Sequence, residues 1–206
     1  MEDLEDYIVT DGLKNMTLPS PEEYDYWGLR KNRIYFIDYL IDDNYSLVEL
    51  TKTIIRMNVE EMDIPKKELK PIYIFIFSYG GDIEQANYAC DIFKTSRIPI
   101  VTVATGAAMS AGLLLLLAGK RRYAFEHSQL MIHEGSGSFS GTASEIEEAQ
   151  KAYQRQVKQM REYIIAHSDI DDETFDKNQK KDWYLTKEEI EKYHIAKIVK
   201  KFEEIV

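Results

Sequence analysis

Residues 105–117 read TGAAMSAGLLLLL, very small residues around one serine followed by five leucines. Small residues let neighbouring backbone approach closely, and an apolar run after a turn is typical of a buried helix. We therefore predict that Ser110 lies at the start of a buried helix, where its hydroxyl and the adjacent backbone N–H groups are fixed in space. Nucleophilic catalysis needs this arrangement, although a core helix that merely begins near a serine has the same pattern.

Strand and helix patterns alternate on both sides of this stretch. The nearly unbroken apolar run at residues 72–77 predicts a strand buried on both faces, as in a parallel sheet. The Gly80-Gly81 pair then turns the chain into a helix, and residues 100–104 form the next expected strand, ahead of the serine-containing helix. This alternation predicts βαβ units, and hence an α/β fold with a parallel core. Further strands are expected at residues 34–37, 123–125, 130–132 and 195–199, and further helices from Ser46 and Thr186.

A capping box at Thr142 and Glu145 opens a long polar helix that we expect to end near residue 166. Its apolar residues form only a narrow stripe at helical spacing: Ile146, Ala149, Tyr153, Val157, Met160 and Ile164. A narrow stripe on a long helix indicates a projecting element that contacts a partner, but a helix lying across its own domain has the same pattern. Residues 169–179 are expected to form a polar connection after this helix.

The first thirty residues differ in charge from the rest of the chain. They hold eight acidic and two basic residues, so their net charge is −6, more than half of the chain's net charge of −10. The prolines in residues 18–21 are expected to interrupt any helix there. We therefore predict an acidic N-terminal arm, residues 1–30, and one domain, residues 31–206, which contains the long helix at about 142–168.

The composition of the chain argues against several functional classes. A net charge of −10 does not fit a nucleic-acid partner, which would need clustered Lys and Arg. The longest apolar run, Leu113 to Ala118, is too short to cross a bilayer, so no membrane is expected as a partner. Metal-ligand spacings and phosphate-binding loops are absent from the sequence, so we expect no metal ion and no cofactor. The single cysteine and an acidic N-terminus unlike a signal peptide are typical of a cytoplasmic protein.

A serine nucleophile needs a base that takes its proton and an acid that orients the base. His133 directly follows the apolar run at residues 130–132, and an open α/β sheet binds ligands at the carboxyl ends of its strands. His133 is therefore the candidate base, although a lone histidine there can also be structural. The residues alone do not select the acid among Asp169, Asp171, Asp172, Asp176 and Asp182.

The Gly80-Gly81 pair lies at the carboxyl end of another expected core strand. A backbone N–H group in this pair could help to bind an oxyanion, with a second N–H group from Ala111. The commonest use of paired glycines is a tight turn, and that alternative stays open.

Three blocks of the chain, taken in order, resemble the signature blocks of the ClpP family, the proteolytic subunit of the Clp protease. They read FSYGG at residues 77–81, GAAMSAG at 106–112 and MIH at 131–133, and the resemblance covers about residues 33–200. Alignment of these blocks implies that Ser110 is the nucleophile and His133 the base. A further family block, an Asp followed by any residue, an aromatic residue, Leu and Ser, is similar to residues 182–186 and implies Asp182 as the acid.

The resemblance implies a ClpP/crotonase-like α/β fold, a spiral core of repeated β-β-α units with a projecting long handle helix. It implies a serine endopeptidase that hydrolyses peptide bonds of unfolded proteins or peptides inside an oligomeric chamber of stacked heptameric rings. An AAA+ unfoldase is a candidate partner. The implied oxyanion hole is formed by Gly81 and Ala111, and the implied substrate-binding residues are Gly80, Asp82, Ile83, Glu134 and Gly135.

The chain also departs from the family pattern. Phe77 and Tyr79 stand where the family usually has Asn and Pro, and Glu134-Gly135 replace the Gln-Pro that commonly follows the histidine. The loss of the proline after the histidine and the gain of glycines and serines at residues 135–138 loosen a segment that in the family pairs with the substrate as an added strand. Two other functions stay open: a non-catalytic or regulatory ClpP-like subunit acting in assembly, and a crotonase-type acyl-CoA enzyme, which would not need the Ser/His/Asp set.

Overall fold

The structure, a computed structural model of the chain, describes residues 19–42 and 46–206. The backbone divides into two compact units, residues 1–32 and 33–206. In the first unit the described residues form one helix, α2 (Pro21–Lys31). The proline segment lies at the start of α2, and no described helix runs through it; Pro is tolerated in the first turn, and Ser20 forms a capping box with Glu23. The rest of the predicted arm, up to residue 18, lies outside the described residues.

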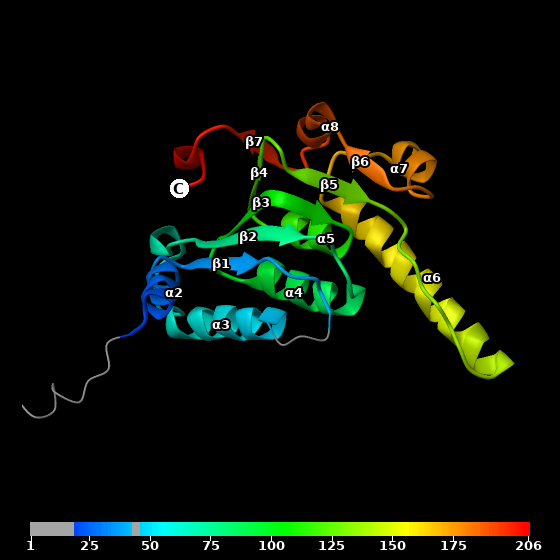
Figure 1. Cartoon of the computed structure of the whole chain (residues 1–206), viewed down its shortest axis with the longest axis horizontal. Helices are drawn as coiled ribbons and strands as arrows, with labels where there is room; N and C mark the ends of the chain where they lie inside the picture. Colours follow the sequence, from blue (N-terminus) through cyan, green and yellow to red (C-terminus); the bar gives the residue numbers. More distant parts are fainter. Residues whose placement is uncertain (1–18, 43–45) are drawn as a thin grey trace, which may run out of the picture. The chain divides into compact units, whose positions relative to one another are not determined.

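The second unit is built on a mainly parallel sheet (Figure 1). Strands β1, β2, β3, β4 and β7 lie side by side in that order and are all parallel, while β5 pairs parallel with β3, and β6 pairs antiparallel with β5. The predicted α/β fold with a parallel core is confirmed. The strands are β1 (Ile34–Ile37), β2 (Ile72–Ser78), β3 (Ile100–Met109), β4 (Arg121–Phe125), β5 (Gln129–Ile132), β6 (Trp183–Leu185) and β7 (Lys197–Val199).

Strand β3 runs beyond its expected end at Ala104 and takes up the small residues before the serine. Its first half pairs with β4 at Val101–Ala104, and its second half pairs with β5 at Ala107–Met109. Residues 107–109 stay extended because they pair with β5, and Ala108 also pairs with Ser78 of β2. Helix α5 (Ala111–Leu117) starts directly after Ser110, and all its residues are buried, as predicted.

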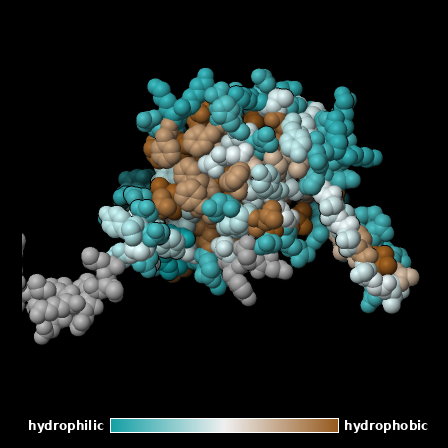
Figure 2. All heavy atoms as spheres, viewed as in Figure 1, coloured by the Kyte–Doolittle hydropathy of each residue, from teal (hydrophilic) through white to brown (hydrophobic). Residues whose placement is uncertain are grey.

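Helices α3 (Ser46–Glu60), α4 (Ile83–Thr95) and α5 all contribute to the main core, on one side of the sheet. The other side carries a smaller apolar cluster, in which Phe75 and Val103 pack with Ile205 from the C-terminal segment. Strand β2 is therefore buried on both faces over most of its length, but Phe77 near its end is 46% exposed. Apolar side chains gather over β1, β2 and the C-terminal segment on the face seen in Figure 2.

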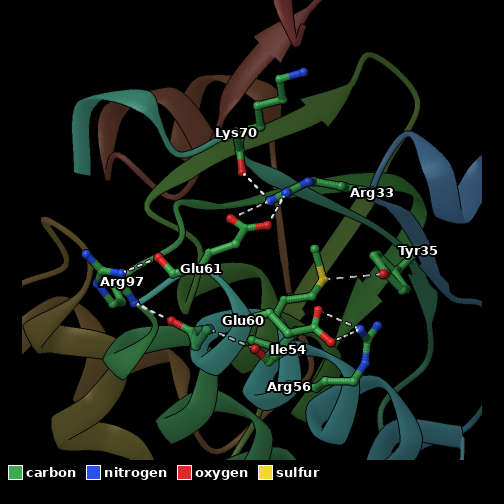
Figure 3. A network of polar contacts seen from close by, with 10 residues as sticks. Arg33, Tyr35, Ile54, Arg56, Glu60, Glu61, Lys70 and Arg97 are labelled. Atoms are coloured by element: carbon green, nitrogen blue, oxygen red, sulfur yellow. Dashed lines mark hydrogen bonds and ion pairs between the residues drawn. The ribbon is translucent and has the colours of Figure 1, made fainter. Parts of the chain in front are cut away.

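The connection between α3 and β2 is held in place by two arginines (Figure 3). Arg33 donates to the carboxylate of Glu61 and, over 3.0 Å, to the carbonyl oxygen of Lys70. Arg97 donates to three backbone carbonyl oxygens of the same connection, at 2.6 Å, 2.6 Å and 3.0 Å. A short helix, η2 (Lys66–Glu68), lies between these anchor points.

The long helix expected from Thr142 is α6 (Ala143–Ala166), and its capping box is present. Its first turns extend away from the rest of the unit, and residues 133–142 run alongside it (Figure 1). Only Met160 and Ile164 of α6 are buried. The remaining elements are α7 (Asp172–Asn178), α8 (Lys187–Lys192) and η3 (Phe202–Glu204). In the part of the chain that the structure describes, no helix has the length and apolar character needed to cross a bilayer.

Candidate active site

The predicted site residues meet at a cleft of about 360 Å³, where β2, β3 and β5 end. Gly80 is buried directly beside Ser110, and Asp182 lies next to His133 outside the cleft lining. The other predicted residues all line the cleft: Gly81, Asp82, Ile83, Ser110, Ala111, His133, Glu134 and Gly135.

Ser110 occupies the sharp turn between β3 and α5. Its backbone has φ 52° and ψ −123°, a combination that non-glycine residues rarely adopt and that is typical of functional sites. The Ser110 N–H donates to the Met131 carbonyl oxygen at 2.9 Å, which ties the turn to β5. Since His133 follows β5, this bond also fixes the serine relative to the histidine. The Oγ of Ser110 lies 2.7 Å from Nε2 of His133, a direct hydrogen bond.

The glycine pair is required by space and by backbone conformation. A Cβ atom on Gly80, which has φ 99°, would lie 2.7 Å from the Met109 carbonyl oxygen and 2.8 Å from the Ser110 Cβ. A Cβ atom on Gly81, which has φ 142°, would lie 1.8 Å from the carbonyl oxygen of Ile41. The pair is thus a tight turn that also lets β2 end against the serine. Gly81 and Ala111, the residues whose N–H groups were predicted to bind an oxyanion, both line the cleft beside Ser110.

Strand pairing brings Asp182 to the histidine. Strands β5 and β6 are antiparallel, with Ile132 opposite Trp183, so His133 and Asp182 are next to each other at the following position. Nδ1 of His133 lies 3.5 Å from Oδ1 of Asp182, within ion-pair range but longer than a good hydrogen bond. The Asp182 side chain is 60% exposed. Catalytic hydrogen bonds are often long without substrate, so this separation does not disqualify the carboxylate.

The other candidate acids have different partners in the described structure. Asp169 binds His194, Asp171 caps α7 through the Thr174 N–H, and Asp172 and Asp176 both accept hydrogen bonds from Arg161. Asp182 is therefore the member of this group that the structure brings to His133.

Helix α6 supplies a wall of the cleft that the sequence did not predict. The unpredicted lining residues are Tyr79, Leu114, Ser136, Tyr153, Gln156, Val157 and Met160. The Tyr153 hydroxyl donates to the Glu134 carbonyl oxygen at 3.3 Å, and the Phe139 ring meets the Tyr153 ring edge to face at 5.7 Å. Partial burial and the Glu134 carboxylate raise the pKa of Tyr153, so this hydroxyl keeps its proton at neutral pH. The apolar stripe of α6 was the available signal, and it was compatible with a partner or with a helix packed on its own domain, but it did not indicate the cleft.

In residues 19–42 and 46–206, no group of three or more His, Cys, Asp or Glu side chains is arranged to hold a metal ion. The cleft brings together the Ser110 hydroxyl and the His133 imidazole, with the Asp182 carboxylate beside the imidazole. This set fits acyl transfer through a serine nucleophile.

Fold and site together define an α/β protein with a serine–histidine pair at the carboxyl ends of parallel strands. A family model described as Clp protease matches residues 23–202, and the chain belongs to the Clp protease family. This membership confirms the resemblance seen in the sequence, and it identifies a ClpP-type protease in general terms. Members of the family generally form oligomeric rings. The crotonase-type alternative receives no support from the match.

Proposed function

We propose that the chain is a serine endopeptidase that hydrolyses peptide bonds of peptides or unfolded proteins, with Ser110, His133 and Asp182 as its triad. The observation that carries the proposal is the 2.7 Å hydrogen bond between Ser110 Oγ and His133 Nε2 at the cleft. At this distance the imidazole can take the hydroxyl proton directly. For Nε2 to accept, the imidazole proton must sit on Nδ1, the nitrogen that faces Asp182.

The reaction follows from these positions. Ser110 Oγ attacks the peptide carbonyl carbon while its proton passes to His133 Nε2. The carbonyl oxygen becomes an oxyanion, for which the Gly81 and Ala111 N–H groups are the proposed donors. His133 then gives its proton to the leaving amine, which departs and leaves an acyl-serine. A water molecule, deprotonated by His133, hydrolyses this ester and restores the Ser110 hydroxyl.

The substrate is proposed to lie extended between residues 81–83 and residues 134–139; residues 81–83 and 134–136 line the cleft. The family match supports a chamber formed by rings, and we propose a homo-oligomer of two stacked heptamers with α6 at the contact between rings. A cytoplasmic location and feeding by an AAA+ unfoldase belong to the same proposal.

The test is reaction of the assembled protein with a fluorophosphonate probe, followed by mapping of the labelled peptide. We expect one adduct per chain, on Ser110, and loss of both labelling and peptide turnover in Ser110→Ala. Ser128→Ala is the matched control, because the Ser128 hydroxyl donates to the Ala104 carbonyl oxygen and does not line the cleft. Absence of an adduct on Ser110 in the assembled wild-type protein would contradict the proposal.

A non-catalytic subunit remains a second candidate, favoured by the 3.5 Å gap between His133 and Asp182 and by residues 133–142, which form neither helix nor strand. The two candidates differ in one measurement. A homo-oligomer that turns over peptide, and loses this activity in Ser110→Ala, is a protease. An assembled particle that neither labels nor cleaves is a regulatory subunit.

A further inference from the structure

Among the described residues, the cleft beside Ser110 is lined by carboxylates and by no Lys or Arg side chain. Asp82 and Glu134 are its charged residues, and no Lys or Arg belongs to its described lining. They stand on the two segments between which the substrate is proposed to lie, so a bound peptide would have a carboxylate on each side. The floor between them is apolar, formed in part by Leu114, Val157 and Met160.

No basic side chain of the described structure pairs with these carboxylates. Within the described residues, no Lys or Arg forms an ion pair with Asp82 or Glu134. Oδ1 of Asp82 instead accepts the Gln85 N–H at 2.8 Å, as the cap of α4. Both side chains are exposed, so a bound substrate can reach them.

A third carboxylate adds to the negative charge at the edge of the cleft. Oε1 of Glu84 accepts a hydrogen bond of 2.8 Å from the Gln156 side chain, which lines the cleft from α6. Its partner is a neutral amide, so the bond fixes the Glu84 carboxylate near the cleft without cancelling its charge. Burial first, and the Glu134 carboxylate second, raise the pKa of Tyr153, which lines the same cleft.

We propose that this cleft selects polypeptides that carry Lys or Arg close to the scissile bond and discriminates against acidic ones; the inference rests on the proposed peptidase function. The physical reason is electrostatic complementarity, since a cationic side chain gains from each carboxylate and an anionic one is repelled. Glu134 is the main determinant, because the N-terminus of α4 offsets part of the Asp82 charge.

The experiment compares kcat/KM of the assembled protein on three quenched fluorescent peptides. All three peptides have the same apolar residue directly before the cleaved bond. They differ at the residue before that apolar residue and at the residue after the bond, where they carry Lys, Gln or Glu. We expect the order Lys, Gln, Glu, with on the order of tenfold between the first and the last at low salt, and a smaller ratio in 0.5 M NaCl. Glu134→Gln should remove most of this ratio, and Asp82→Asn, which keeps the cap, a smaller part.

Glu188→Gln is the matched control, because it removes the same charge from exposed α8 outside the cleft and should leave the ratio unchanged. Equal kcat/KM for the three peptides, with turnover that depends on Ser110, would overturn the charge selectivity and leave the peptidase intact.

A second measurement does not depend on catalysis: binding of the Lys and Glu peptides to Ser110→Ala by fluorescence anisotropy. Tighter binding of the Lys peptide supports the selectivity even if the wild type proves inactive, in which case only the peptidase function fails. Equal binding of the two peptides to Ser110→Ala contradicts the selectivity.

Discussion

At the scale of single residues, the proposed mechanism makes the orientation of the His133 imidazole depend on one exposed carboxylate. Asp182 Oδ1 is 3.5 Å from Nδ1, and in the proposed triad it favours the tautomer in which Nε2 can accept the serine proton. We expect Asp182→Asn to lower kcat by about 10²–10⁴ with a smaller change in KM, because an amide can favour the wrong tautomer. The measurement is turnover of a neutral peptide by the assembled variant.

The matched control for this substitution is Asp169→Asn. Asp169 Oδ2 lies 2.5 Å from Nδ1 of His194, so the same chemical change breaks a similar His–Asp contact away from the cleft. We expect wild-type turnover from Asp169→Asn. Wild-type turnover from Asp182→Asn would remove this residue from the mechanism.

The only cysteine of the chain should be chemically silent in the folded protein. Cys90 is 2% exposed, and burial raises the pKa of its thiol from 9.0 to about 12. Since the thiolate is the reactive form, we expect no reaction with Ellman's reagent at pH 8 in the native protein and one thiol per chain in denaturant.

The same pKa shift has a defined effect on stability. The pKa of the thiol is higher in the folded state than in the unfolded state. Its contribution to the free energy of unfolding is therefore fully present below the unfolded pKa and declines as pH rises from about 9 toward 12. The measurement is the free energy of unfolding of wild type and of Cys90→Ala between pH 9 and 12. If wild type does not lose stability relative to Cys90→Ala over this range, the raised pKa of the thiol is contradicted.

At the scale of elements, local patterns predicted most helices and strands, but they missed the two that flank Asp182 in the sequence, α7 and β6. Helix α7 lies in a stretch with only one large apolar residue that is fully buried, Phe175, so its pattern is that of a polar connection. Strand β6 is three residues long, and it is held by pairing with β5 rather than by its own sequence. The long-range register between these strands decides which Asp meets His133, and local spacing does not contain that information.

The arginine contacts of the connection between α3 and β2 lead to a stability prediction. Arg97→Ala removes three hydrogen bonds from a charged donor to backbone carbonyl oxygens, and we expect a loss of about 1–3 kcal/mol in the free energy of unfolding. Arg97→Lys should recover little, because an ammonium group lacks the fork geometry of the guanidinium group. Denaturant titration of the three proteins measures both effects.

The control comes from the same region of the structure (Figure 3). Arg56 binds the carboxylate of Glu60 one turn away on α3, and both side chains are more than half exposed. Such a pair contributes about 0.3–0.5 kcal/mol, so Arg56→Ala should change stability little. Equal losses from Arg56→Ala and Arg97→Ala would mean that the backbone contacts of Arg97 do not hold the connection.

At the scale of the whole molecule, helix α6 contributes both to the core and to the cleft. Its last turns bury Met160 and Ile164 in the core, and its middle turns line the cleft with Tyr153 and Val157. Its first turn carries Ile146, which is 37% exposed and belongs to no core cluster of the described chain. The apolar stripe therefore continues past the surface that one chain can bury, which favours a second copy as its partner.

The substitution that tests this assembly is Ile146→Asp. We expect it to halve the particle mass in light scattering, as paired rings separate, while thermal unfolding of the chain changes little because the residue is exposed. Arg155→Asp, a charged substitution on the opposite face of α6, should keep the full mass. The same helix lines the cleft, so loss of the contact between rings should leave this wall of the cleft less constrained. We therefore expect separated rings to have a lower kcat/KM on peptides. Full mass in Ile146→Asp would place the contact between rings elsewhere, and wild-type kcat/KM in separated rings would show that the cleft does not depend on the pairing.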